Sequence, residues 1–135
     1  MQMARFIGLS ALLASVLCLA GCGPSVGATY KVTGTVKFSD GTPLTKGTVL
    51  FTSDKHSATG PIQEDGTYSL TTLKPGDGAP PGDYKVTLGG DAAGTYPDNK
   101  PLVDPKFLGT TTSGLTASVK NQKLQYDITV EKPPQ

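Results

Sequence analysis

The chain has 135 residues, of which 12 are Lys or Arg and 11 are Asp or Glu, so its formal net charge is +1. The lysines stand singly among acidic residues, and this argues against nucleic-acid binding, which depends on clustered basic side chains. The 17 glycines and 11 prolines favour short strands joined by turns.

The first 21 residues have the pattern of a secretory signal peptide. Arg5 is the only charge before an apolar stretch that continues to Gly21. A membrane-spanning helix needs about 20 predominantly apolar residues with flanking charges, whereas a signal has a positive start, a shorter apolar helix and small residues at the cut. We therefore expect residues 1–21 to be a signal helix that is removed.

The quartet Leu19-Ala20-Gly21-Cys22 resembles the lipobox of bacterial lipoproteins. The resemblance implies cleavage between Gly21 and Cys22 and attachment of fatty chains, such as palmitate, to Cys22. Cys18 would leave with the signal, so the mature chain would hold one cysteine and no internal disulfide. Two or more acyl chains give stable attachment to a membrane. The alternative is an ordinary secretory signal with a bystander cysteine.

Residues 22–29 are expected to form a flexible tether that reaches on the order of 15 Å. One domain follows over residues 30–132, with a tail at 133–135. A tether of this length places the domain close to the membrane surface. Gly23, rather than an acidic residue, follows the cysteine, and by analogy with enteric bacteria this favours the outer membrane over the inner one, facing the periplasm or the cell surface.

Apolar residues then alternate with polar ones at a period of two, which is typical of strands with one buried face. Seven strands are predicted, at residues 30–38, 47–52, 58–63, 67–73, 83–89, 115–119 and 124–130. Pro61 places its strand at an edge, because proline cannot donate to a ladder. We expect Tyr68 and Tyr84 to fill the core with their hydroxyls at its wet rim, and Thr87 to face outward. Gly34 is expected to leave room for an opposing aromatic ring or a bulge.

These strands indicate an all-β fold, a seven-stranded antiparallel sandwich of the transthyretin-like or immunoglobulin-like kind. The motifs VTGTV (32–36), DGTPL (40–44), GTVLF (47–51), DGTY (65–68) and PGDYKV (81–86) resemble, in this order, carboxypeptidase regulatory-like domains, whose fold is transthyretin-like (prealbumin-like). Together with PKF (105–107) and SGLT (113–116), they are also similar to small planctomycete-type lipoproteins. The resemblance implies a fold and an accessory role, but no activity.

Catalytic residues are few. His56 is the only histidine, in a loop with Ser53 and Ser57, and the alternative function that we keep is a hydrolase that uses this loop. Residues so close in a loop rarely hold the geometry of a catalytic triad. One histidine and one lipidated cysteine also make no standard zinc site. We expect no enzyme activity, no cofactor and no metal.

The long irregular stretch 89–114 is the preferred place for a partner, because connections usually have about 4 to 6 residues. Its candidate contact residues are Tyr96, Asp98, Asn99, Asp104 and Phe107. The three oxygen-bearing side chains leave calcium open as an alternative, and the two aromatic residues are explained equally well by packing. A crossover between sheets is the structural alternative for the whole stretch.

The sequence therefore predicts an exported lipoprotein with a non-enzymatic β-sandwich. Its contact with the membrane is made through the lipid anchor, and its partner is a protein or a glycan. An envelope structural role is a further alternative.

Overall fold

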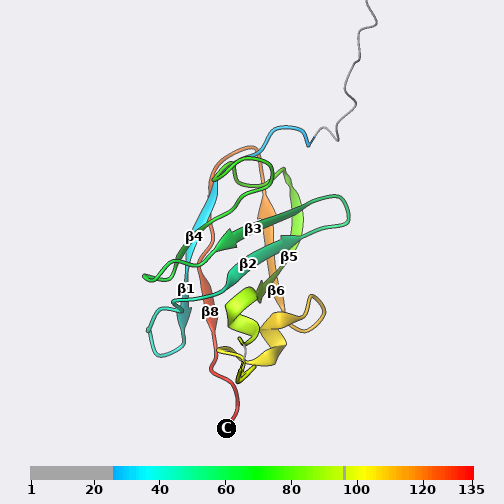
Figure 1. Cartoon of the computed structure of the whole chain (residues 1–135). Helices are drawn as coiled ribbons and strands as arrows, with labels where there is room; N and C mark the ends of the chain where they lie inside the picture. Colours follow the sequence, from blue (N-terminus) through cyan, green and yellow to red (C-terminus); the bar gives the residue numbers. More distant parts are fainter. Residues whose placement is uncertain (1–25, 96) are drawn as a thin grey trace, which may run out of the picture.

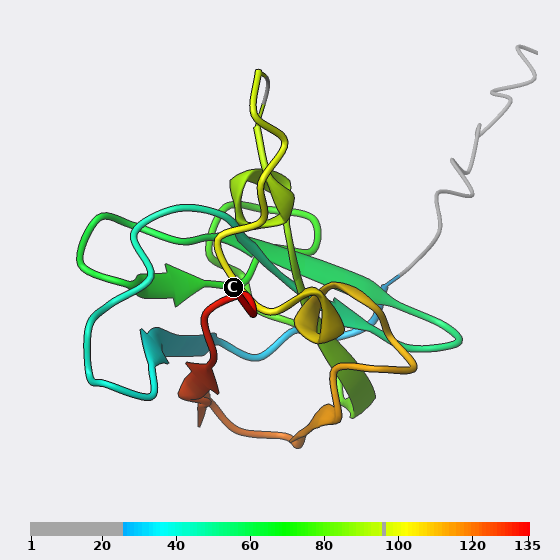
Figure 2. The same ribbon diagram turned by 90° about the horizontal axis from the view of Figure 1, so that it is seen from below.

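The structure, a computed structural model, describes residues 26–95 and 97–135. The signal segment, Cys22 and Tyr96 lie outside the described residues. Two four-stranded sheets pack face to face, which confirms the predicted β-sandwich (Figure 1). Viewed from below, β1 and β8 lie in one layer and β2 and β3 in the other (Figure 2). Among the described residues, no helix is long and apolar enough to cross a membrane.

The described residues form eight strands, one more than predicted, because the last predicted strand is divided into two. In chain order the strands are β1 (Val32–Phe38), β2 (Thr48–Thr52), β3 (Ser57–Pro61), β4 (Thr67–Ser69), β5 (Gly82–Gly89), β6 (Leu115–Val119), β7 (Leu124–Gln125) and β8 (Ile128–Val130). Two short 3-10 helices, η1 (Gly90–Ala93) and η2 (Pro105–Leu108), lie between β5 and β6.

One sheet has the order β3-β2-β5-β6, and every pairing in it is antiparallel. β3 lies at its edge, as Pro61 predicts. β1 is central in the other sheet, between β4 and the β7 and β8 strands.

The prediction of a wholly antiparallel sandwich is wrong at β1, which pairs in parallel with β7 and β8. β6 ends at the end of the sandwich where β1 begins, and the turn at residues 120–123 crosses from one sheet to the other. Leu124 therefore lies opposite Val32. Because the chain reverses in this turn, β7 runs in the same direction as β1.

The division between β7 and β8 falls at Tyr126 and Asp127, where the strand pairing with β1 is interrupted although the Tyr126 amide still donates to the Thr33 carbonyl at 2.8 Å. The Tyr68 hydroxyl donates to the Tyr126 carbonyl at 2.5 Å, and the Asp127 carboxylate accepts the Thr35 amide at 3.0 Å. Gly34 faces this point, and a Cβ there would lie 2.9 Å from the Tyr68 ring. The expectation that Gly34 admits an aromatic ring is confirmed, and the interruption of the last strand lies against the same glycine.

The core lies between the sheets and contains both tyrosines, Tyr68 and Tyr84, as predicted. Their hydroxyls donate to main-chain carbonyls, that of Tyr84 to Pro80 at 2.7 Å, rather than meeting water at a rim. Thr87 is also buried, in contrast to the prediction, because the segment between β5 and β6 packs against this end of β5.

That segment joins two neighbours in the same sheet, so it is no crossover between sheets. Instead it closes the end of the sandwich that is far from the start of β1. Val103 and Phe107 enter the core, and the Asp104 amide donates to the Glu131 carbonyl at 2.8 Å. This bond links the segment to the chain that leaves β8 in the opposite sheet.

Candidate functional site

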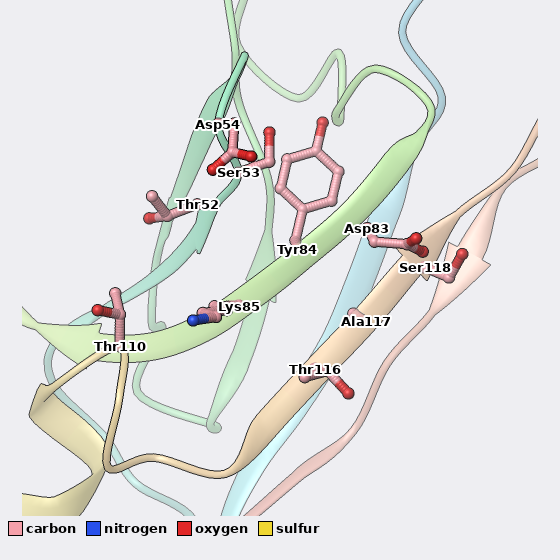
Figure 3. Close-up of a pocket in the computed structure, with 10 residues that line it drawn as sticks. All are labelled: Thr52, Ser53, Asp54, Asp83, Tyr84, Lys85, Thr110, Thr116, Ala117 and Ser118. Atoms are coloured by element: carbon pink, nitrogen blue, oxygen red, sulfur yellow. The ribbon is translucent and has the colours of Figure 1, made fainter.

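An open hollow of about 770 Å³ lies on the outer face of the β2, β5 and β6 strands. Figure 3 shows its lining side chains. We call it the hydroxyl-rich hollow; its residues are Thr52, Ser53, Asp54, Asp83, Tyr84, Lys85, Thr110, Thr116, Ala117 and Ser118.

The register of the sheet places these residues in rows. Lys85 lies opposite Thr52 on one side and Thr116 on the other, so one row of the hollow has a lysine between two threonines. In the next row Asp83 lies opposite Ser118. Asp54 adds a second carboxylate, so the hollow offers a cation, two carboxylates and several hydroxyls to a polar ligand.

The aromatic residue of the hollow does not form a platform for stacking. Tyr84 is only 2% exposed, its hydroxyl is bonded to the Pro80 carbonyl, and burial raises its pKa. Recognition in the hydroxyl-rich hollow would depend on hydrogen bonds and charge.

Sequence reasoning missed this hollow, although part of the signal was present. Alternation places Lys85 and Thr116 on outward positions of their strands. Which outward residues become neighbours depends on the pairing of β2, β5 and β6, and Thr110 joins them from the distant segment before β6. Only the tertiary structure brings these elements together.

The His56 loop is held as a tight turn through its main chain. The Ser53 hydroxyl donates to the His56 carbonyl at 3.1 Å and accepts the His56 amide at 3.0 Å. It also accepts the Lys55 amide at 3.4 Å. These bonds give the Ser53 hydroxyl a structural role, since its proton is directed to a carbonyl and not to the imidazole.

Of the five candidate contact residues in the segment 89–114, the four that the structure describes have different surroundings. Asp98 and Asn99 are exposed, and Asn99 has a φ of 49°, a left-handed conformation that asparagine tolerates. Asp104 caps η2 by accepting the Lys106 amide at 2.9 Å. Phe107 is 5% exposed and packs in the core.

A metal site would need several of these oxygen ligands around one point. Among residues 26–95 and 97–135, no three His, Cys, Asp or Glu side chains gather closely enough to hold a metal ion. The Asp104 carboxylate accepts the Lys106 amide of η2, and the described residues contain no cluster of oxygen ligands for calcium.

No protein-family model and no curated protein matches the chain. Among solved structures, it is similar to the TIE protein of Bacillus anthracis, with a TM-score of 0.51 and 13% identity over 78% of this chain and 17% of that protein. It is also similar to a DUF3823 family protein from Bacteroides ovatus, with a TM-score of 0.48 and 22% identity over 77% of this chain and 45% of that one. The chain thus spans less than half of either protein, and at these identities the likeness concerns the β-sandwich fold alone.

Proposed function

We propose that this protein is a bacterial lipoprotein, held by acyl chains on Cys22, whose β-sandwich acts as a non-enzymatic binding module at the membrane surface. The observation that carries the proposal is the quartet Leu19-Ala20-Gly21-Cys22 at the point where the apolar run ends. Each buried methylene contributes about 0.8 kcal/mol, so two or more chains hold the protein stably without help from its side chains.

The same proposal assigns the domain to the carboxypeptidase regulatory-like kind. Its Asp-Gly-Thr motifs support this, because both build the same turn. Asp40 accepts the amide and the hydroxyl of Thr42 at 3.0 and 2.6 Å, and Asp65 accepts those of Thr67 at the same two distances. The Thr42 and Thr67 bonds hold the pKa of each carboxyl below its usual value.

The ligand of the module is a protein or a glycan, and its binding face is the hydroxyl-rich hollow. Lys85, Asp83 and the flanking hydroxyls suit a ligand that is rich in hydrogen-bonding groups. The outer membrane is favoured over the inner membrane, because Gly23 and not an acidic residue follows Cys22.

The anchor is tested by intact-mass analysis of the protein purified from bacterial membranes with detergent. We expect a chain that begins at Cys22 and carries diacylglycerol on its sulfur. Cys22→Ser should abolish both the cleavage and the lipid mass, whereas the matched control Cys18→Ser should leave the mature mass unchanged. A water-soluble mature chain that is unmodified, or that begins at another residue, would refute the proposal.

The binding face is tested by a photo-crosslinking residue at Thr116, with a control at Thr129 on the opposite sheet. In intact cells we expect covalent adducts from position 116 and few from position 129. Mass analysis of the adducts separates a protein ligand from a glycan. Equal yields at both positions would contradict the assignment of the ligand to this face.

The alternative of a hydrolase is tested separately. We expect the protein to turn over none of a broad panel of ester, amide and glycoside substrates, and we expect no difference between the parent and His56→Ala. Activity that disappears in this variant, while the thermal stability is unchanged, would favour the enzyme.

A further inference from the structure

One end of the sandwich carries both the start of β1 and an exposed leucine. We define the tether end as residues 30–31, 71–81 and 120–123. Tyr30 and Ala79 exchange two main-chain hydrogen bonds, at 2.9 and 3.0 Å. The chain that comes from the N-terminus is therefore fastened to the loop that follows β4 (Figure 1).

Leu73 projects from this loop with 63% of its surface exposed. The only other large apolar side chain that is exposed in the described chain is Leu102, at 40%, in the segment at the far end of the sandwich. Burial of such a side chain is favourable wherever an apolar environment is available. Leu73 is therefore the main apolar group that the tether end can offer to a surface.

The exposure of Leu73 is built into the loop. The Asp77 carboxylate accepts the amides of Thr72, Leu73 and Lys74 at 2.7, 3.0 and 3.0 Å. The Thr72 hydroxyl donates to the Gly78 carbonyl at 2.7 Å. These bonds hold the loop in a conformation that directs the leucine outward.

Within the residues that define the tether end, the charges are mostly positive, and the exposed Asp83 at the start of β5 lies just outside them. Its four lysines are Lys31, Lys74, Lys120 and Lys123, and its one carboxylate is that of Asp77, which is engaged by the main chain. Lys31 and Lys123 also flank a hollow of about 290 Å³ beside Leu124. Basic side chains near an apolar group are suited to the phosphates of an anionic lipid surface.

The length of chain between Cys22 and Tyr30 limits how far this end can lie from an anchored cysteine. Eight residue steps span at most about 28 Å when fully extended. The segment with η1 and η2 lies at the opposite end of the sandwich (Figure 1). An acyl anchor at Cys22 therefore keeps the tether end within about 28 Å of the bilayer, and the start of β1 is the part of the sandwich nearest to the anchor along the chain.

From these observations we infer that the tether end docks on an anionic phospholipid surface, with Leu73 in the interfacial layer and the four lysines at the phosphates. This inference rests on the proposed lipid anchor and adds a defined orientation to it. The η1 and η2 end then points away from the bilayer. The hydroxyl-rich hollow, on a face parallel to the strands, stays open to a ligand from the side.

The test uses the full-length protein, processed in bacteria and reconstituted in vesicles of phosphatidylcholine and phosphatidylglycerol. Leu73→Cys carries an environment-sensitive fluorophore, and Leu102→Cys carries the same label as the matched control. We expect a blue shift and strong quenching by bromine-labelled lipids at position 73, and neither at position 102. The quenching should weaken in Lys74→Gln/Lys123→Gln and at high salt, where the Debye length falls to about 3 Å.

Intact mass, measured on the same sample, separates the two ways to fail. If Cys22 is acylated but the label at position 73 reports water, or reports the same environment as position 102, the docking inference is wrong and the anchor stands. Equal quenching on pure phosphatidylcholine would overturn the role of the lysines. If Cys22 carries no lipid, the anchor is refuted, and the inference fails with it because nothing then holds this end at the bilayer.

Discussion

The hydrogen bond from Tyr68 to the Tyr126 carbonyl joins β4 to the break between β7 and β8, and its removal gives a sharp prediction. Tyr68 is 3% exposed and its hydroxyl lies 2.5 Å from that carbonyl. Tyr68→Phe deletes the hydroxyl and leaves the ring in place against Gly34. The variant therefore isolates the polar contact from the packing.

The expected loss of unfolding free energy is about 1–2 kcal/mol. A typical hydrogen bond contributes about 1 kcal/mol net, and a buried group that loses its partner adds a desolvation cost of similar size. For a domain near 100 residues, each kcal/mol changes the melting temperature by about 4–6 °C. The melting temperature of Tyr68→Phe should accordingly fall by about 4–12 °C.

The assay is urea unfolding followed by circular dichroism, together with a thermal melt. The midpoint should fall while the slope of free energy against urea stays the same, because the surface exposed on unfolding is unchanged. Tyr30→Phe is the control, since the Tyr30 hydroxyl makes no hydrogen bond to another described residue. If Tyr68→Phe is as stable as the parent, or if Tyr30→Phe loses as much, the reasoning is refuted.

Three further outcomes are expected from the same unfolding measurements. In Gly34→Ala the free energy of unfolding should fall by about 1–3 kcal/mol, because the added methyl group overpacks against Tyr68 and the adjacent main chain. Gly27→Ala should leave the stability unchanged, because a Cβ at that position meets nothing within 4 Å. Equal effects in the two variants would contradict the steric argument. In Phe107→Ala the free energy of unfolding should fall by about 3–5 kcal/mol, because the ring is buried. The exposed Leu102 is the control, and Leu102→Ala should lose much less stability. A small loss in Phe107→Ala would mean that this ring does not hold the segment on the core. Burial raises the pKa of Tyr68 in the folded protein above 10.0. The stability that the neutral tyrosine contributes is therefore complete below pH 10.0 and is lost as the pH rises through the pKa of the folded state. If stability declines at alkaline pH in the same way in Tyr68→Phe, other groups cause the decline.

The strands themselves were accessible from the sequence, because alternation with a period of two is a local property. Pro61 indicated an edge strand, and Gly34 indicated that an aromatic ring approaches the main chain. Both predictions were possible because a single residue type restricts the backbone or the space beside it. The division of the last strand was not accessible. It depends on Asp127 meeting the Thr35 amide, a contact between residues 92 positions apart.

The candidate site divides in the same way. The lipobox quartet is contiguous, so the sequence alone was sufficient to predict the anchor at Cys22. The long segment before β6 was recognised by its length, but Phe107 proved to be a core residue, because burial depends on what covers a side chain and not on its neighbours in the chain.

What the amino-acid sequence determined by itself is therefore local: which stretches extend and where they turn. Only the tertiary structure decided which strands pair and in which direction, since pairing depends on contacts across the chain. It placed Lys85 between Thr52 and Thr116. It also brought the loop that carries Leu73 to the start of β1, because Ala79 of this loop is hydrogen-bonded to Tyr30.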